Sequence, residues 1–447
     1  MRNLVAAIDL GTTKVVCLVG EKTAAGIKII AMSEAPSKGV NRGEVVNIQS
    51  VLDSMMPTIH EVEGAIGEKI NEVFTGIAGQ YIKCTQGTDQ TERENPDELI
   101  TQEEIDKITG KMYEGNCRHD EVVLHAIPQS YIIDNFMGET KPVGMSGKQI
   151  FSNFKLFIGK KISAQHKKNV IARGGLKLKE LILEPVASAK AVLDEEEMEI
   201  GVALLDIGGG TTDLLIIKDN IVRHAAVIPF GGNSITDDLK QGCGVSHRVA
   251  EQLKTDHGSC ISTLAQDKRV RIPGVGGRED REISLRLIAG IIEARVEEIL
   301  EAAAWEIEQS GYKDQIKSGI VITGGSSQLA NLKQIANTIT GMPVRLACPD
   351  RMFNDGEVHV NNPALSTAVG LIIAGFEHLG KTGAKNNSTT PIDYGTKEEK
   401  PKAEENKEQP KAAAPATEKV EKKKDPVNWG NFWKKVSGKD MFNENEA

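Results

Sequence analysis

The stretch Leu205-Asp206-Ile207-Gly208-Gly209-Gly210-Thr211-Thr212-Asp213 decides the fold, because Ala7-Ile8-Asp9-Leu10-Gly11-Thr12-Thr13-Lys14 repeats its pattern near the N-terminus. In both stretches an apolar run ends in a carboxylate, turns on glycine and continues with two hydroxyl residues. Glycine lets backbone N–H groups come close to a ligand and cradle phosphate oxygens. Threonine hydroxyls add hydrogen-bond donors, and the aspartates suit a hydrated Mg²⁺ ion. Two copies, one in each half of the chain, indicate a cleft with one phosphate-binding turn on either side.

The residues that follow each turn exclude two common phosphate-binding folds. Lys14–Gly20 and Leu214–Lys218 are short apolar runs rich in β-branched residues, which favour strands. Each glycine turn is therefore predicted to join two strands of a hairpin. A Walker-type loop or a dinucleotide-binding fingerprint would lead into a helix instead. Two unrelated hairpins are the structural alternative.

Composition limits the classes of function. The 447 residues suffice for two or more domains, and 39% hydrophobic with 26% charged residues is typical of a soluble globular protein. The net charge of −9 argues against a nucleic-acid partner. Six scattered cysteines form neither a zinc pattern nor a disulfide framework, which favours a reducing cytoplasm. The chain enters strand-like sequence at once, so no signal peptide is expected, and no apolar run was expected to approach the ~20 residues of a membrane span.

The pattern of apolar residues predicts alternating strands and helices. We expect strands at 4–9, 15–19, 26–33, 73–78, 122–127, 130–133, 150–158, 180–183, 202–206 and 319–323, and helices at 48–70, 164–173, 234–240, 249–256, 285–309, 328–339 and 363–376. Pro57 is expected to kink or break the first of these helices. Thr101 with Glu104 forms a capping-box pattern that opens a short helix. Residues 83–160 interrupt this alternation of strands and helices and have the size of a small α+β insert. Residues 265–281 are predicted to form a loop.

A third glycine turn, Thr323-Gly324-Gly325-Ser326, follows another buried strand but has no acid at the strand end. Its glycines would let a base or ribose lie against the backbone. Glu251 and Lys254 are three residues apart, hence on one helical face, and could contact that nucleoside. A surface ion pair is the alternative for this pair.

In this order the motifs resemble the superfamily of ATPases that unites actin, heat-shock chaperones and sugar kinases, and within it the FtsA family of actin-like bacterial division proteins. Asp9–Lys14 and Asp206–Asp213 are similar to its two phosphate motifs, Val321–Gln328 to its adenosine motif, and Glu184–Ala189 and Asn361–Gly375 to its connecting helices. The resemblance is also carried by Glu184-Pro185-Val186-Ala187-Ser188-Ala189-Lys190-Ala191-Val192-Leu193 and Gly231-Gly232-Asn233-Ser234-Ile235-Thr236-Asp237-Asp238. It covers about residues 1–378 and the C-terminal tail. It implies an α/β actin-like ATPase fold, with two lobes around a nucleotide cleft and a small α+β insert in the first lobe.

The resemblance implies ATP and Mg²⁺ as cofactors and assigns roles to residues. Asp9 and Asp206 would hold Mg²⁺ through water, and Glu184 and Asp206 would be the catalytic pair, with Glu184 orienting the attacking water. A helix N-terminal acid is the alternative reading of Glu184. The implied nucleotide-binding residues are Asp9, Gly11, Thr12, Thr13, Lys14, Gly208, Gly209, Gly210, Thr211, Thr212, Gly231, Gly232, Glu251, Lys254, Gly324, Gly325 and Ser326. The implied activity is at most a slow ATPase, since members of the family use ATP chiefly to set conformation and polymerisation.

The same resemblance divides the chain into subdomains. The division is 1–82 with 161–197 as subdomain 1A, 83–160 as subdomain 1C, 198–228 with 318–378 as 2A, 229–317 as 2B, 379–425 as a disordered linker and 426–447 as an amphipathic tail. The linker is also predicted from its composition, since Lys, Glu, Ala, Pro, Asn and Thr cannot bury enough apolar surface to fold.

The tail carries a second independent signal. Trp429, Phe432, Trp433 and Val436 follow one another at helical spacing, and Lys434 and Lys435 flank this apolar face. A short helix with aromatic residues on one side and lysines beside it fits a membrane interface. The alternatives are docking on the chain's own core or on another protein.

The family resemblance also implies partners and a location. The partners are the C-terminal peptide of the tubulin-like FtsZ, further copies of the chain in filaments, membrane lipid and other divisome proteins, at the cytoplasmic face of the inner membrane at the division site. Arg295 and Glu298, on a helix similar to the one that binds FtsZ, are the candidate peptide contacts, although Ala294 departs from the common family sequence. The alternatives are a sugar or other small-molecule kinase of the same superfamily, a chaperone ATPase, and an actin-like scaffold of pilus assembly.

Overall fold

The computed structural model describes residues 2–24, 26–134, 136–274, 276, 279–349 and 358–383. The chain divides into two units, Met1–Thr389 and Thr390–Ala447, and every described residue belongs to the first. Most of the predicted linker and the whole of the predicted tail, with Trp429, Phe432, Trp433, Lys434, Lys435 and Val436, lie outside the described residues.

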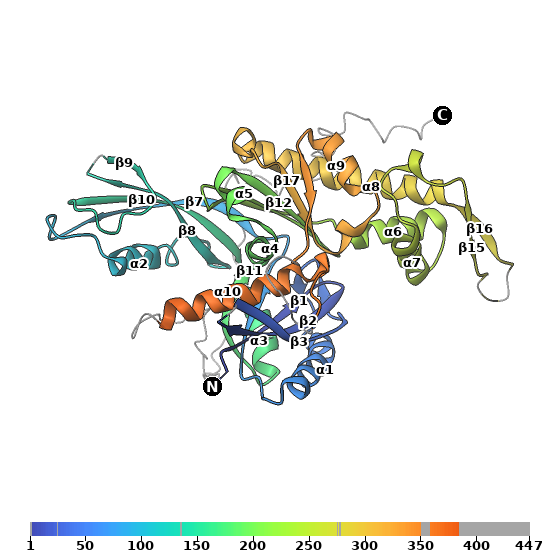
Figure 1. Cartoon of the computed structure of the whole chain (residues 1–447), viewed down its shortest axis with the longest axis horizontal. Coiled ribbons are helices and arrows are strands. Elements are labelled where there is room, and N and C mark those ends of the chain that lie inside the picture. The colour runs from blue at the N-terminus through green and yellow to red at the C-terminus, as the bar shows by residue number, and fades with distance from the viewer. Residues whose placement is uncertain are drawn as a thin grey trace, which may run out of the picture. The chain divides into compact units, whose positions relative to one another are not determined.

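Two five-stranded sheets with the same strand order form the framework (Figure 1). The first runs β11 (Lys177–Leu183), β6 (Glu72–Ile77), β1 (Leu4–Leu10), β2 (Lys14–Thr23), β3 (Gly26–Pro36). The second runs β18 (Val344–Leu346), β17 (Ile320–Thr323), β12 (Val202–Ile207), β13 (Thr212–Lys218), β14 (Ile221–Ile228). In both, the central strand pairs antiparallel with the next strand along the chain and parallel with a later one. The predicted hairpins and the α/β class are thereby confirmed, and we call the two halves the first and second lobe.

Helices cover both faces of the first sheet, as the near-continuous apolar composition of β1 requires. Ile8 and Leu10 join a core with α1 (Ile48–Ile66) and α3 (Lys161–Arg173). Val5 and Ala7 face the opposite way, into a core that α4 (Glu184–Val192) and α10 (Ser366–Gly383) share. This second core also contains residues of β12 and β13, so one apolar layer joins the two lobes.

Helices and a small hairpin make up the rest of the second lobe. They are α6 (Gly232–Cys243), α7 (His247–His257), the hairpin β15 (Arg269–Ile272)–β16 (Arg281–Ser284), α8 (Leu285–Gln309) and α9 (Leu332–Thr340), with α5 (Glu195–Ile200) before β12. Figure 1 shows α6, α7, α8 and the hairpin gathered together. Short 3₁₀ turns occur at Ser262–Leu264, Lys313–Gln315, Gly325–Gln328 and Pro363–Leu365, and β4 (Val40–Asn41) pairs with β5 (Glu44–Val45) in the first lobe.

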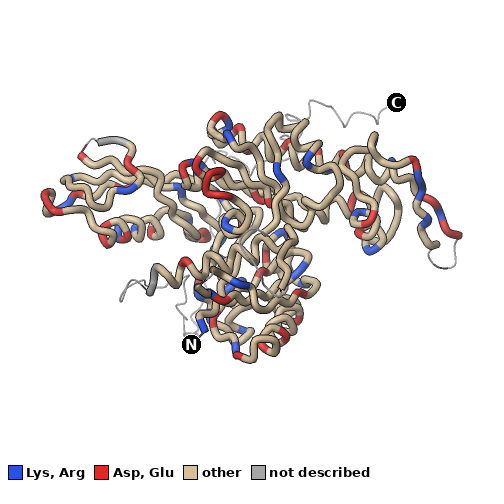
Figure 2. The backbone as a smooth tube through the Cα atoms, in the orientation of Figure 1, with Lys and Arg blue, Asp and Glu red and all other residues tan. Residues whose placement is uncertain are grey.

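The predicted insert is an α+β unit with its own core, as expected. Its sheet runs β7 (Lys83–Glu92), β10 (Gln149–Lys160), β8 (Glu121–Ile133), β9 (Phe136–Glu139), and α2 (Gln102–Lys111) packs beside β8. The capping box of Thr101 and Glu104 is present at the start of α2. Basic and acidic residues alternate along the described chain, in the insert and elsewhere (Figure 2).

Several predicted elements differ in the structure for identifiable reasons. The predicted break at Pro57 is absent and α1 continues through it, since Pro57 is exposed and buried Met55 and Ile59 anchor both sides. The two strands predicted at 122–127 and 130–133 are one strand, β8. The loop predicted at 265–281 contains β15, and the helix predicted from 328 begins only at Leu332, after a 3₁₀ turn.

The last described helix corrects two expectations. α10 continues to Gly383, so 379–383, the first residues assigned to the linker, are helical. Pro363–Gly380 is also long and apolar enough to cross a membrane by length and composition, so the expectation that no run approaches that length was wrong. Within the fold 61% of this window is buried, and α10 packs on α4 and β1 as a core helix does.

Gly370 on α10 sets the distance between the two connecting helices and gives a test of this packing. A Cβ on residue 370 would lie 1.8 Å from the Ala187 carbonyl oxygen of α4, so Gly370→Ala must push the helices apart. We expect a loss of about 2–3 kcal/mol in unfolding free energy, measured by urea denaturation. Gly380→Ala on the same helix is the control, since nothing lies within 4 Å of its Cβ, and should be neutral or slightly stabilising. Equal midpoints for the two variants would contradict the packing described.

Candidate functional site

The two glycine turns line a single cavity between the lobes. The first glycine turn, Asp9–Lys14, joins β1 to β2, and the second glycine turn, Asp206–Asp213, joins β12 to β13. The cavity has a volume of about 100 Å³ and is lined by Asp9, Gly11, Thr12, Thr13, Lys14, Gly43, Glu184, Asp206, Gly208, Gly209, Gly210, Thr211, Asp213, Gly324, Gly325, Pro363, Ala364 and Thr367. Residues from both halves of the chain therefore face one crevice, as the repeat predicted.

The turns approach each other so closely that only glycine fits in the second. A Cβ on Gly209 would lie 2.3 Å from Thr13 Cγ2, and one on Gly210 would lie 2.6 Å from Thr12 Oγ1. The Thr12 hydroxyl also accepts a hydrogen bond of 3.2 Å from the backbone N–H of Gly43. The cavity of about 100 Å³ is smaller than the ~300–1,000 Å³ usual for small-molecule sites, because the two turns lie in contact across it.

Three aspartates give the cavity an excess of acidic groups. Burial and the Glu184 carboxylate raise the pKa of Asp9 to about 7, and burial raises the pKa of Asp206 to about 6. Asp206 accepts hydrogen bonds from Ser188 (2.6 Å) and Thr367 (3.3 Å). Asp213 also has a raised pKa through burial, and its Oδ1 is buried without a hydrogen-bond partner. A positive charge beside these three carboxyl groups would stabilise their ionised forms.

This donor set fits Mg²⁺ held through water. Mg²⁺ is a hard ion that keeps several water ligands and takes only one or two carboxylates. Among the described residues no three acidic, histidine or cysteine side chains lie close enough to hold a metal directly. Asp9 and Asp206 would therefore hold the ion through its waters, with Asp213 beside them.

Glu184 reaches the cavity from the first turn of α4, immediately after β11. Its Oε1 accepts a hydrogen bond of 2.9 Å from Lys167 Nζ on α3, whose side chain is 2% exposed. The same ammonium donates to the carbonyl of Gly76 in β6 (2.8 Å). The carboxylate is thus fixed against the first sheet at the edge of the cleft.

Lys14 lines the cavity but its ammonium pairs with Glu34 on the neighbouring strand β3 at 2.8 Å. Its charge is therefore directed towards Glu34. To contact phosphate it would leave Glu34 or bridge the two groups.

The remaining predicted nucleotide residues form a hydrogen-bonded network next to the cavity and do not line it. Ser326 donates to the Gly208 carbonyl (3.2 Å), and the Gly232 N–H donates to the same oxygen (2.9 Å). Lys254 is buried and donates to the Gly232 carbonyl (3.0 Å) and to Thr236. Glu251 pairs with Lys254 at 2.8 Å, so this pair is a partly buried part of the network. Thr212 Oγ1 donates to the Phe230 carbonyl, and Gly231 packs on the second glycine turn.

The third glycine turn differs from these residues, because its Gly324 and Gly325 line the cavity itself.

Sequence reasoning missed several residues of the site. Asp213 ends the second glycine turn and has no predicted role, although a further acid beside a phosphate-binding turn is itself a signal of a cation site. Gly43, Ser188 and Thr367 reach the site from distant segments. Lys167 gave no local signal, because an isolated lysine in a helix looks like a surface residue.

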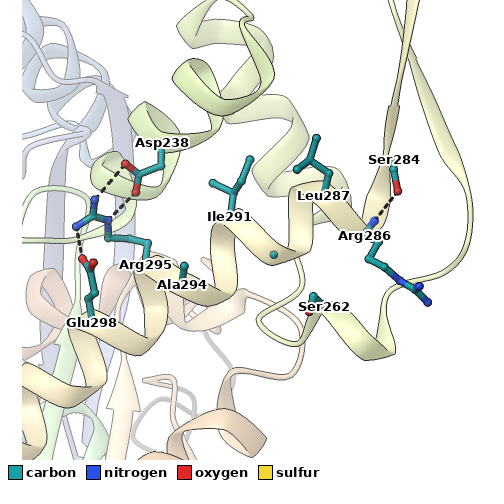
Figure 3. A pocket seen from close by; sticks show the side chains of 10 residues that line it. Asp238, Ser262, Ser284, Arg286, Leu287, Ile291, Ala294, Arg295 and Glu298 are labelled. Atoms are coloured by element: carbon teal, nitrogen blue, oxygen red, sulfur yellow. Dashed lines mark hydrogen bonds and ion pairs between the residues drawn. The ribbon is translucent and has the colours of Figure 1, made fainter. Parts of the chain in front are cut away.

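The predicted partner residues Arg295 and Glu298 line a different cavity, a groove of about 640 Å³ along α8 (Figure 3). Arg295 forms a two-bond pair with Asp238 of α6 (2.6 and 3.1 Å), contacts Glu298 and lies 5.5 Å from the centre of the Phe230 ring. Leu287, Ile291 and Ala294 add an apolar face beside this charged end.

The fold has counterparts among solved structures at low sequence identity. The PilM–PilN type IV pilus biogenesis complex contains a chain with TM-score 0.61 and 14% identity, covering 83% of this chain and 98% of that one. MreB5 of Spiroplasma citri bound to AMPPNP has a TM-score of 0.50 and 16% identity, and the match covers 86% of this chain and 97% of that one. The two matching lobes and the crevice between them define an actin-like ATPase fold.

Sequence comparison narrows this class to one family. The family model "Cell division protein FtsA" matches residues 203–370, and "SHS2 domain inserted in FTSA" matches 79–158. The cell division protein FtsA of Pseudomonas aeruginosa is 35% identical over 377 residues, covering 84% of this chain and 90% of that protein. The cell division protein FtsA of Escherichia coli K12 is 34% identical over 388 residues, and the match covers 85% of this chain and 92% of that protein. The chain belongs to the FtsA family of cell division proteins.

The raised pKa of Asp9 predicts that replacing this residue increases the free energy of unfolding, and that the increase depends on pH, when Mg²⁺ and nucleotide are absent. The folded-state pKa lies near 7, above the ordinary 3.8, so the stability that this carboxyl contributes is lost as the pH rises from about 4 through about 7. Asp9→Asn should therefore raise the unfolding free energy more at pH 8 than at pH 5, by on the order of 2 kcal/mol.

Urea denaturation of the parent and the variant at both pH values measures this difference. Asp53→Asn, an exposed position on α1, is the control and should behave alike at both. An equal effect of Asp9→Asn at pH 5 and pH 8 would contradict the electrostatic account.

Proposed function

We propose that this protein binds ATP with Mg²⁺ between its lobes, self-associates into filaments and tethers FtsZ filaments to the inner face of the cytoplasmic membrane at the division site. The observation that carries the proposal is the pairing of two glycine turns across one acidic crevice in a member of the FtsA family. The insert, in this proposal, provides the self-association surface, and other divisome proteins bind the assembled filament.

The cleft residues support binding of a triphosphate. Backbone N–H groups of Gly11, Gly209 and Gly210 would surround phosphate oxygens, with the hydroxyls of Thr12, Thr13 and Thr211 as further donors. The partly buried network of Ser326, Lys254 and Glu251 beside Gly232 would receive the nucleoside. Mg²⁺ bound with ATP would neutralise phosphate charge that the acidic cavity otherwise repels.

Slow hydrolysis is the chemistry that these groups would perform. Phosphoryl transfer depends on positioning and charge neutralisation more than on covalent chemistry by the protein. Glu184, fixed at the edge of the cleft, would orient the attacking water, and Asp206 would hold the hydrated ion. Closure of the small cavity around ATP would exclude other water.

The groove along α8 supports binding of a short peptide. Its volume of about 640 Å³ and its apolar face of Leu287, Ile291 and Ala294 suit apolar side chains of a partner. Arg295 and Glu298 place charges of both signs at one end, where they would orient the peptide.

Leu287→Glu tests the groove. Leu287 is 50% exposed, so the substitution should leave the fold intact and weaken binding of the FtsZ C-terminal peptide at least tenfold by placing a charge on the apolar face. Fluorescence anisotropy with a labelled peptide measures the affinity. Leu346→Glu, 42% exposed on β18, is the matched control and should bind like the parent. Unchanged affinity for Leu287→Glu would reject the groove as the peptide site.

The C-terminal tail is proposed as the membrane anchor on its sequence alone. Its aromatic face and lysines suit the interface of an anionic bilayer, where each basic residue adds ~1 kcal/mol. If the linker is a flexible coil, it would reach roughly 40 Å.

Trp433→Glu in the full-length protein tests the anchor. Co-sedimentation with vesicles containing anionic lipid should fall to the level seen with neutral vesicles, since a carboxylate replaces the aromatic ring on the apolar face. Asn431→Glu adds the same charge at a position away from that face and should keep most of the binding. If Trp433→Glu sediments as well as the parent, the anchor is elsewhere.

A further inference from the structure

Lys167 is a buried lysine whose ammonium points at the proposed catalytic carboxylate. Its residue is 1% exposed, and its two hydrogen bonds go to Glu184 Oε1 (2.9 Å) and to the Gly76 carbonyl (2.8 Å). Burying an ammonium is costly unless it is paired, and an apolar side chain of similar size usually stabilises such a position equally well or better. The presence of lysine at this position therefore calls for a role other than stability.

Gly76 leaves the space that the Glu184 side chain occupies. A Cβ on residue 76 would lie 2.5 Å from Glu184 Cγ and 3.0 Å from Glu184 Oε1. The Glu184 side chain thus packs on a strand position without a side chain, and its Oε1 also contacts the Lys167 ammonium of α3. Two independent features, a glycine and a buried cation, fix one carboxylate.

The arrangement leaves one oxygen of Glu184 for the cleft. Lys167 contacts Oε1, while the Glu184 side chain lines the cavity together with both glycine turns. Lys167 is not among the residues that line this cavity, so it acts on a bound nucleotide only through Glu184.

We infer that Lys167 is a positioning residue for ATP hydrolysis, which holds Oε1 of Glu184 against Gly76 so that Oε2 accepts a hydrogen bond from the attacking water. The inference rests on the proposed function. In this step the water oxygen forms a bond to the γ-phosphorus, and the bridging oxygen leaves with its electron pair on ADP. Of the two water protons, one stays on the inorganic phosphate and the other passes by way of Glu184 to solvent.

Lys167 also sets the charge of the cleft. Asp9, Glu184, Asp206 and Asp213 line one small cavity, and Lys167 is a buried cation immediately behind them. An uncharged side chain at 167 would remove this cation and the hydrogen bond that holds Glu184 in place.

A double-mutant cycle in the full-length protein tests the inference. Lys167→Met, Glu184→Gln and the combined variant are compared with the parent in single-turnover ATP hydrolysis, and calorimetry measures the ATP–Mg²⁺ affinity of each. We expect Lys167→Met to lower the hydrolysis rate about 10–100-fold, as loss of a positioned water does, with the dissociation constant changed by less than about threefold. In the Glu184→Gln background, Lys167→Met should lower the rate no further.

Two further variants separate positioning from general damage to the fold. Gly76→Ala displaces the same carboxylate from the strand side and should reproduce the loss of rate while keeping Lys167. Lys168→Met removes a lysine from the next position of α3, about 100° around the helix, and should hydrolyse ATP like the parent.

The outcomes distinguish this inference from the proposed function. Additive losses in the double variant, or a rate unchanged in both Lys167→Met and Gly76→Ala, overturn the positioning role while nucleotide binding stands. ATP binding by the parent without any hydrolysis also overturns it. Failure of the parent to bind ATP–Mg²⁺ overturns the proposed function itself.

Discussion

The close approach of the two glycine turns across the cleft is the constraint on which the rest of the structure depends. Gly209 and Gly210 lie against Thr13 and Thr12 with no space for a Cβ, so the backbones of both turns line one small cavity. The matching strand order of the two sheets brings the turns to this position, because each hairpin starts from the central strand of its sheet. The apolar layer of α4 and α10 shared by both lobes sets the separation between them.

Burial gathers acidic groups in this crevice. It raises the pKa of Asp9 and Asp206, and the buried Oδ1 of Asp213 has no hydrogen-bond partner. A hydrated cation held between these carboxylates would favour their ionised forms.

The insert contacts both lobes. It is covalently part of the first lobe, yet Gln129 of β8 donates to the Val222 carbonyl of β14 (2.9 Å) and accepts from Arg223 (3.2 Å) in the second lobe. The second lobe also carries the groove along α8, so these hydrogen bonds join the surface proposed for self-association to the lobe with the proposed peptide site.

The sequence predicted the hairpins, the sheets and most of the cleft, because these depend on local patterns: apolar runs, glycine turns and acids at strand ends. α8 and the capping box at Thr101 were found for the same reason. Lys167, Gly43 and Thr367 were missed because their roles arise from contacts between distant segments, which no local pattern encodes. Pro57 does not end α1, because its exposure and the packing of Met55 and Ile59 outweigh the lost hydrogen bond. The kink expected there remains a prediction, as do the residues of the proposed tail and peptide site.

A crystal structure with a non-hydrolysable ATP analogue and Mg²⁺ tests the central claim most directly. The account predicts β- and γ-phosphates contacted by backbone N–H groups of both the Asp9–Lys14 and the Asp206–Asp213 turns, with the ion bound to Asp9 and Asp206 through water. A nucleotide bound by one lobe alone, or outside this crevice, would contradict it.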